Sequence, residues 1–337
     1  MSKMATAPLT FSLPEELNAS TPPERRGLRR DHVRLMISDR STGASEHVRF
    51  HQLDQFLQPG DVVVLNSSRT IPAVLRTEDR EVRLARRLSD RHWDAFIMGK
   101  TVQAGEKLIF SPALQAEVHR IKTPLVELRF SLSDACLLEQ IYALGEPIRY
   151  EYIHQPWPLE YYQNVYASEP GSVELPSAGR AFSWEVLFRL KRRGIHVAYL
   201  TLHTGLSYLS EELGALPPEA NCEYYHIPQE TVERVSQAKQ AGNRVIAVGT
   251  TVVRALESDW LRKAPHEAKA GWTCIHIDAH TPLRVVDGLM TGFHEPEASH
   301  LDLLSAFAPP ESLRRMYEEA IQLRYLWHEF GDIHLII

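Results

Sequence analysis

A strand, a tight turn and a helix follow one another directly in the last third of the chain, and this signature constrains the fold most. Residues 244–258 read RVIAVGTTVVRALES. The apolar run Val245–Val248 predicts a buried strand, Gly249-Thr250-Thr251 predicts the turn, and apolar residues at helical spacing predict the helix. A helix that begins directly after a buried strand is a building unit of α/β folds, so we expect a sheet covered by helices.

The turn itself is a candidate ligand site. Gly249 permits a sharp turn and a close approach of a ligand to the backbone. Thr250 or Thr251 can cap the helix and leave N–H groups pointing outward, which suits an anionic or carboxylate-bearing small molecule. A buried strand followed by a threonine-capped helix without any ligand has the same pattern, and this stretch alone favours that simpler interpretation.

Length and composition exclude several classes. A chain of 337 residues with 44% hydrophobic residues can bury a substantial core in two domains, so disordered and fibrous proteins are excluded. No apolar run reaches membrane-spanning length, and residues 1–10 lack the pattern of a signal peptide. The formal net charge of −6 argues against a strongly basic nucleic-acid binder, although a local basic surface remains compatible with it.

Cysteine and histidine spacing indicates neither a disulfide framework nor a metal site. The three cysteines, Cys136, Cys222 and Cys274, are odd in number and far apart, which predicts a reducing, cytoplasmic environment without disulfides. None of the sixteen histidines has a paired metal-ligand spacing. We interpret His276 and His280 as residues of a strand region, and we expect no metal.

Patterns along the chain predict an α/β domain interrupted by an all-β insert. Alternating residues predict a hairpin from 32–38 and 46–50, and Ser183 is predicted to cap a helix. Between 73 and 149 the strands become short and closely spaced, which is typical of a small antiparallel barrel. We therefore predict an α/β domain from 1–72 and 150–337. Its further strands are expected at 61–66, 195–202, 273–278, 284–287 and 331–337, and its further helices at 230–241, 299–307 and 311–325.

Polar residues follow two of the predicted strands. Asn66 and Arg69 come after the strand 61–66, and His203 and Gly205 come after the strand 195–202. Ligands of open α/β sheets bind at the carboxyl ends of the strands. A guanidinium there suits a carboxylate or phosphate, and a histidine suits proton transfer. Turns closed by Asn and Ser side chains and a hydrogen-bonded structural histidine are the alternatives.

Short motifs run in one order along nearly the whole chain. They are Val64–Ala73, Tyr162–Ala167, Pro176–Gly179 with Phe182 and Ser183, Thr201–Leu206, Glu223–Tyr225, Arg244–Thr251 with Arg254–Ser258, Phe293 and His294 with Pro296, Leu304–Ala308, and Gly331 with Asp332. No single motif is diagnostic, but the ordered set resembles the S-adenosylmethionine:tRNA ribosyltransferase-isomerase family of queuosine biosynthesis.

The resemblance implies a fold and a reaction. The fold is a larger α/β, partly barrel-like domain with an inserted small β-barrel, which agrees with the patterns above. S-adenosylmethionine is implied as the co-substrate, and no metal or redox cofactor is. Its ribosyl part is transferred to the aminomethyl group of a 7-deazaguanine base in tRNA and isomerised to an epoxycyclopentane, with release of adenine and methionine. We expect tRNA as the partner, no membrane, and a monomer or homodimer.

The implied chemistry suggests roles for individual residues. A sulfonium acidifies the neighbouring carbon, so a base is needed, and His203 is the first candidate and His294 the second. Asp332 completes the candidate catalytic set. Candidates for substrate binding are Asn66 and Arg69 for a carboxylate, hydroxyls or the deazaguanine edge, Thr250, Thr251 and Arg254 for the donor, and Ser177, Gly179, Gly205, Glu223 and Gly249.

The chain departs from the usual family pattern at polar positions. Ala181 and Asn221 replace histidines, and Glu297 replaces a lysine. The usual closing motif Ser-Tyr-Gly-Asp-Ala-Met becomes residues 329–334, EFGDIH, which places Glu329 and His334 there. Because phosphate contacts depend on Lys and Arg, these changes weaken the case for tRNA.

Three functions therefore compete. The chain performs the family reaction, or it uses S-adenosylmethionine with another acceptor such as a free deazapurine, or it is a catalytically silent paralogue that binds a nucleoside or a protein. A group of arginines either forms a tRNA-facing patch or is merely solvated. These are Arg25, Arg26, Arg29 and Arg30 with Arg192 and Arg193.

Overall fold

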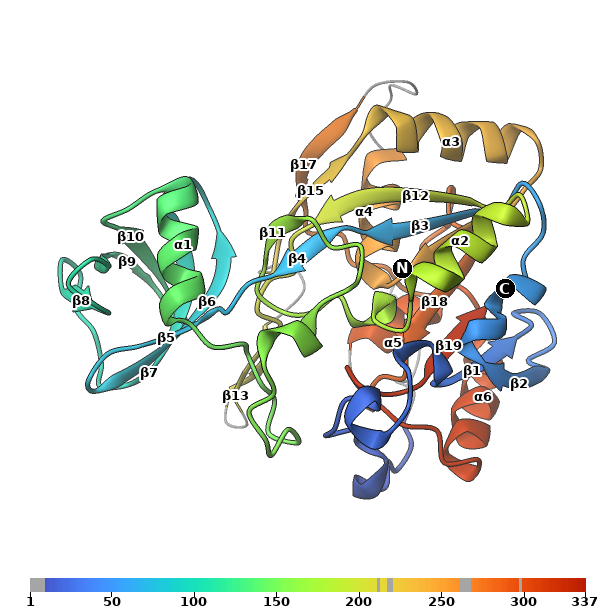
Figure 1. Cartoon of the computed structure of the whole chain (residues 1–337), viewed down its shortest axis with the longest axis horizontal. Helices are drawn as coiled ribbons and strands as arrows, with labels where there is room; N and C mark the ends of the chain where they lie inside the picture. Colours follow the sequence, from blue (N-terminus) through green and yellow to red (C-terminus); the bar gives the residue numbers. More distant parts are fainter. Residues whose placement is uncertain (1–9, 211–212, 217–220, 261–267, 297–298) are drawn as a thin grey trace, which may run out of the picture.

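A nine-stranded mixed sheet forms the centre of the larger part of the molecule (Figure 1). The computed structural model describes residues 10–210, 213–216, 221–260, 268–296 and 299–337. The strands lie in the order β17 (Lys269–Thr273), β15 (Glu223–Ile227), β12 (His196–Leu202), β3 (Val62–Asn66), β16 (Val245–Val248), β18 (Gly288–Gly292), β19 (Ile333–Ile336), β1 (Arg34–Ser38) and β2 (Ser45–Arg49). The mixed α/β class predicted from the sequence is confirmed.

Strand β3 shows why the sheet is buried on both faces. It pairs in parallel with β12 and β16, and all five of its residues are buried. Side chains alternate across a strand, so Val62 and Val64 pack into one core while Val63 and Leu65 pack into another. The continuous apolar run in the sequence reflects this two-sided burial.

Helices supply the apolar residues that cover the two faces. The core around Val62 includes residues of α3 (Gln229–Gln240), α4 (Thr250–Trp260), α5 (Ser299–Leu304) and α6 (Pro310–Gln322). The core around Val63 includes α2 (Trp184–Arg192), and Ser183 caps this helix by accepting a hydrogen bond from Val186 N, as predicted. Short 3-10 turns join these elements at Glu15–Leu17, Pro23–Arg26, Arg30–His32, Phe50–Gln55, Leu159–Tyr162 and Ser177–Gly179. No helix within the described ranges is long and apolar enough to span a membrane.

The inserted β region has its own sheet and its own core. Its antiparallel strands lie in the order β5 (Val74–Arg76), β6 (Arg80–Arg87), β7 (His92–Gly99), β10 (Leu125–Phe130), β9 (Gln115–Lys122) and β8 (Lys107–Ile109). Helix α1 (Asp134–Leu144) packs on this sheet through Leu137 and Ile141. Within the described residues the strands β5 and β8 are the edges, so the sheet is a curled half-barrel. Figure 1 shows it standing apart from the large sheet.

Two short strand pairs complete the described structure. β4 (Ser68–Thr70) pairs in parallel with β11 (Glu169–Ser172) beside the chain segment that leads to the insert. β13 (Tyr208–Ser210) pairs with β14 (Gly214–Ala215) in an antiparallel hairpin. The hairpin predicted near the amino terminus is confirmed as β1 and β2.

The strands predicted at 273–278 and 284–287 are wrong. Strand β17 ends at Thr273 and β18 begins at Gly288, so the segment between them, including His276 and His280, is not in a strand. Its backbone groups bond elsewhere: the Glu257 carboxylate accepts from the amides of residues 284–286, and Asp278 and Thr281 close a turn. The tertiary contact with Glu257 therefore outweighs the local β propensity of this segment.

The expectation of no disulfide is also wrong. Cys222 and Cys274 are bonded to each other although 52 residues separate them in sequence. The pairing of β15 with β17 places Glu223 opposite Thr273 and so brings the two cysteines together. Cys136 is free and exposed. Sequence spacing alone carried no signal for this pairing.

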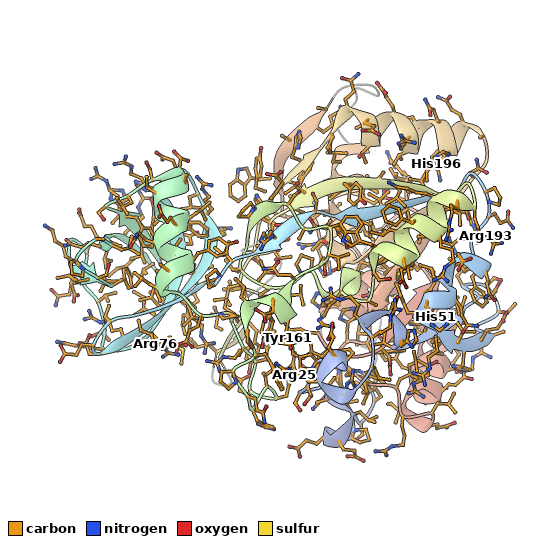
Figure 2. The ribbon with its side chains drawn as sticks, in the orientation of Figure 1. Arg25, His51, Arg76, Tyr161, Arg193 and His196 are labelled. Atoms are coloured by element: carbon orange, nitrogen blue, oxygen red, sulfur yellow. A yellow bond between two sulfur atoms is a disulfide. The ribbon has the colours of Figure 1, made fainter. Side chains whose placement is uncertain are left out.

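The arginines of the candidate tRNA-facing patch lie in two separate places. Figure 2 shows Arg25 beside Tyr161 and Arg193 at a distant end of the molecule. The Arg25 guanidinium lies 5.3 Å from the centre of the Tyr161 ring, and Arg193 is paired with Asp54 at 3.2 Å. Arg25 and Arg193 therefore do not belong to one continuous patch.

Replacing Glu257 tests the contact that overrides the predicted strand. Glu257→Ala would leave three backbone amides without their acceptor, and each unsatisfied buried group costs about 1–3 kcal/mol. We expect urea denaturation to show a free energy of unfolding lowered by about 3 kcal/mol or more. Glu233→Ala, at an exposed position of α3, is the matched control and should change the free energy of unfolding by less than about 0.5 kcal/mol. Equal effects of the two substitutions would contradict this account.

Candidate functional site

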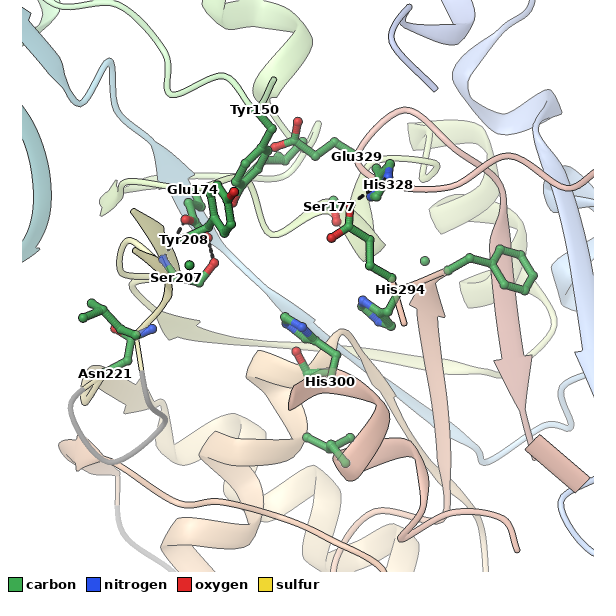
Figure 3. A pocket seen from close by; sticks show the side chains of 18 of the residues that line it. Tyr150, Glu174, Ser177, Ser207, Tyr208, Asn221, His294, His300, His328 and Glu329 are labelled. Atoms are coloured by element: carbon green, nitrogen blue, oxygen red, sulfur yellow. Dashed lines mark hydrogen bonds and ion pairs between the residues drawn. The ribbon is translucent and has the colours of Figure 1, made fainter. Parts of the chain in front are cut away.

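A cavity of about 710 Å³ lies at the carboxyl ends of the parallel strands β16 and β18. This is the edge where α/β sheets bind ligands, and the volume is typical of a small-molecule site. Figure 3 shows tyrosine, glutamate and histidine side chains from distant segments around this space. The lining comes from residues 150–152, 174–175, 275–277, 292–296 and 328–329, from Ser177, Ser207, Tyr208, Gly214, Leu216 and Asn221, and from helices α4 and α5.

The turn before α4 brings the helix start to the cavity. Gly249 adopts a φ of +92°, a left-handed conformation that favours glycine, and its carbonyl accepts hydrogen bonds from Val252 N and Val253 N. Thr250 lines the cavity. Thr251 instead faces the interior, where its hydroxyl accepts a hydrogen bond from Asn66.

Three of the predicted binding residues meet at one ion pair. Arg254 lines the cavity and pairs with buried Glu223, which also accepts a hydrogen bond from Gly205 N at 2.9 Å. A Cβ on Gly205 would lie 2.7 Å from the side-chain oxygen of Asn221 and 3.2 Å from the Ala85 carbonyl, so this close packing requires glycine. The positive charge of Arg254 is thus balanced within the protein.

Four histidines line the cavity: His276, which the sequence placed in a strand region, and His294, His300 and His328, of which only His294 was a candidate. His294 contacts the Thr291 hydroxyl at 2.7 Å and stacks on His300 with ring centres 4.5 Å apart. Burial and the neighbouring histidines hold the pKa of His294 well below its usual value. Burial lowers the pKa of His300 and of His328 to about 4. The rings of His294, His300 and His328 are therefore neutral at pH 7.

Four glutamates of the cavity lining were also missed, namely Glu151, Glu174, Glu295 and Glu329, and two of them have strongly raised pKa values. Burial raises the pKa of Glu174 to about 7 and that of Glu329 to about 8. Glu174 accepts hydrogen bonds from the amide and the hydroxyl of Ser207 at 2.7 and 2.8 Å. Perturbed carboxyl groups in a cleft are typical of functional sites. The sequence offered one signal, the glutamate at the start of the divergent closing motif.

His203 is not among the described residues that line the cavity. Its Nδ1 is 2.8 Å from the Ser68 hydroxyl, which contacts the Ser172 hydroxyl at 2.6 Å. A Cβ on Gly171 would lie 2.5 Å from the imidazole ring, so glycine lets the backbone approach. Burial lowers the pKa of His203 to about 4.

Two other polar candidates are engaged in contacts within the protein. Both polar atoms of the Asn66 side chain are hydrogen-bonded, to Leu202, Ser68 and Thr251. The Asp332 carboxylate accepts hydrogen bonds from the backbone amides of Arg34 and Leu326 at 2.7 and 2.8 Å. Neither side chain is among the described residues that line the cavity.

The remaining candidates are placed differently. Ser177 lines the cavity. Arg69 is exposed on β4 and does not belong to the described lining. Gly179 is buried, and a Cβ there would come within 1.9 Å of the Tyr166 hydroxyl, so close packing requires glycine.

Only some of the positions that depart from the usual family pattern line the cavity. Asn221 lines it, whereas Ala181 is buried in the core around Val63. His334 is buried, contacts the Ser38 hydroxyl at 2.9 Å and stacks on the Phe293 ring. Glu297 lies outside the described residues.

A possible metal-ligand group lies elsewhere, on the half-barrel sheet. Ligand atoms of His92, His119 and Glu127 all lie within 4.8 Å of one another. Lys122, however, places its ammonium 2.9 Å from Glu127, so a cation already neutralises this carboxylate. The group is separate from the cavity.

Known proteins resemble the chain over its full length. The profile of the family described as queuosine biosynthesis protein matches residues 6–336. The S-adenosylmethionine:tRNA ribosyltransferase-isomerase of Carboxydothermus hydrogenoformans is 38% identical, with 97% of this chain and 98% of that protein covered. The enzyme of the same name from Thermotoga maritima is 35% identical, with 99% and 100% covered.

The structural comparison agrees with the sequence comparison. The crystal structure of S-adenosylmethionine tRNA ribosyltransferase from Thermotoga maritima matches with a TM-score of 0.58 and 31% identity, covering 98% of this chain and 99% of that one. The fold, the ordered motifs and these matches together show that the chain belongs to the queuosine biosynthesis protein family.

Proposed function

We propose that this protein is an S-adenosylmethionine-dependent ribosyltransferase-isomerase that acts on tRNA. It transfers and isomerises the ribosyl part of S-adenosylmethionine onto a 7-aminomethyl-7-deazaguanine base, gives epoxyqueuosine, and releases adenine and methionine. The observation that carries the proposal is the cavity at the strand ends, in a chain that matches relatives of this name from end to end. We further propose that the reaction uses no metal.

The donor and the base have candidate positions in the cavity. Thr250 and the first amides of α4 can bind the methionine carboxylate, because the amino end of a helix attracts anions. His294 lines the cavity in its neutral form and can accept the proton next to the sulfonium. We therefore place His294 before His203 as the base. The ion pair between Arg254 and Glu223 stabilises the wall of the cavity.

A second function shares the donor and differs in the acceptor. Most arginines of the candidate tRNA-facing patch already have partners in the protein: Arg29 pairs with Asp31 and Glu185, Arg30 pairs with Glu24, Arg26 donates to the Phe330 carbonyl, and Arg193 pairs with Asp54. Arginines in such pairs are less available to phosphates. This observation favours a small acceptor, such as a free deazapurine, as the alternative.

A cytoplasmic location follows from the proposed tRNA substrate. The Cys222–Cys274 disulfide argues the other way, since disulfides are rare in reducing compartments. A monomer or a homodimer remains our prediction.

The function is tested by incubating the protein with S-adenosylmethionine and deazaguanine-bearing tRNA, with a control that lacks tRNA. We expect tRNA-dependent release of adenine and methionine and formation of modified tRNA. We also expect binding to tRNA to weaken steeply as salt increases. Donor binding without a tRNA product would favour the alternative acceptor. Absence of both would favour a silent paralogue.

The identity of the base is tested with three single substitutions. We expect His294→Ala to lower kcat by about 10²–10⁴-fold, the usual contribution of a general base, with the affinity for S-adenosylmethionine nearly unchanged. His203→Ala should have a much smaller effect on kcat, because His203 is not among the described lining residues and its Nδ1 contacts the Ser68 hydroxyl. His226→Ala, on the exposed face of β15, is the control. A larger loss for His203→Ala than for His294→Ala would reverse the assignment.

A further inference from the structure

Glu174 and Glu329 form a carboxyl pair on one wall of the cavity. Each lines the cavity, and the negative charge of Glu174 adds to the burial that raises the pKa of Glu329. The Oε2 atom of Glu329 is buried and has no hydrogen-bond partner among the residues that the structure describes. A buried acceptor without a partner costs free energy in the empty protein, so it is suited to receive a donor from a ligand.

Tyrosine rings stand beside the carboxyl pair. The rings of Tyr150 and Tyr152 are stacked with centres 5.8 Å apart, and Tyr152 also stacks on His328 at 4.2 Å. Tyr150 lies close to both carboxyl groups, whose charges raise its pKa further above the value that burial produces. Figure 3 shows Tyr150 between Glu174 and Glu329. The faces of such rings attract cations.

The described lining offers little positive charge to balance this wall. Arg254 is the only arginine or lysine in the described lining, and Glu223 already neutralises it. His294, His300 and His328 are neutral at pH 7 because burial lowers their pKa values. An unbalanced acidic wall in a partly enclosed site favours a positively charged ligand.

We infer that Glu174 and Glu329, together with the rings of Tyr150 and Tyr152, form a subsite for an organic cation, either an ammonium or a sulfonium group. The ligand's identity rests on the proposed function: S-adenosylmethionine carries both cations, and the aminomethyl base carries an ammonium. In this subsite the ligand donates to the free oxygen of Glu329 or lies against the rings. Arrival of the cation stabilises both carboxylates in their charged form.

The subsite is tested by calorimetric titration of the wild-type protein and of Glu174→Gln and Glu329→Gln. Glutamine has nearly the same shape as glutamate. Because each carboxyl group is partly protonated in the empty protein, a neutral side chain is tolerated there, and both variants should fold. We expect each substitution to weaken binding of S-adenosylmethionine by about tenfold or more, the effect of losing one charged hydrogen bond. Glu160→Gln, at an exposed position, should leave binding unchanged.

Two further ligands identify which cation is bound. S-adenosylhomocysteine lacks the sulfonium charge and keeps the ammonium, and 7-aminomethyl-7-deazaguanine carries only the acceptor's ammonium. If the variants weaken S-adenosylmethionine alone, the subsite holds the sulfonium. If they weaken both adenosyl compounds, it holds the donor's ammonium, and if they weaken only the base, it holds the acceptor. Unchanged affinity for all three ligands would overturn the inference.

Substitution of Tyr152 provides a second test that leaves both carboxyl groups in place. Tyr152→Phe keeps the ring face and should retain most of the affinity for the cation, whereas Tyr152→Leu removes that face and should reduce it several-fold. Equal affinities of the two variants and the wild-type protein would contradict a role for the ring.

A simple cation separates this inference from the proposed function. Trimethylsulfonium, titrated while tyrosine NMR signals are followed, should bind weakly to the wild-type protein and not to Glu329→Gln. Such binding, with no release of adenine when S-adenosylmethionine and deazaguanine-bearing tRNA are both present, would refute the proposed function and support the subsite. Adenine release by the wild-type protein, with equal trimethylsulfonium response in both proteins, would support the function and refute the subsite.

Discussion

The buried side chain of Asn66 joins the structural elements that form the edge of the cavity. Its amide nitrogen donates to the Leu202 carbonyl at 2.8 Å and to the Thr251 hydroxyl at 3.3 Å, and its oxygen accepts from the amides of Leu202 and Ser68. One side chain thereby links the ends of β3 and β12 to the first turn of α4. A fully satisfied buried polar network is rigid, so it positions Thr250 and the residues around His203.

Electrostatic balance distinguishes the cavity from an ordinary polar cleft. His294, His300 and His328 are neutral, the one arginine of the described lining is paired, and the carboxyl groups of Glu174, Glu295 and Glu329 have raised pKa values. The charges of this site are therefore set by burial as much as by residue type.

Local sequence patterns predicted the elements in which local and tertiary preferences agree. The strand β3, the strand–turn–helix of β16 and α4, and the Ser183 cap were all found where the pattern placed them. The segment 284–287 failed because its propensity was opposed by a tertiary contact, in which the amides of residues 284–286 donate to Glu257. The predicted closed barrel is an open half-barrel in the described residues, and edge pairing of this kind has no local signature.

The sequence by itself determined the α/β class, the insert, the family resemblance, and several residues that reach the cavity, including Ser177, Thr250, Arg254 and His294. These are properties of short stretches and of motif order. The tertiary structure alone decided that Glu174 and Glu329 face one space and that Cys222 bonds Cys274. The tertiary structure also shows that the side chains of Asn66 and Asp332 form hydrogen bonds within the protein. Burial and the proximity of groups far apart in the chain depend on packing, and no local pattern encodes them.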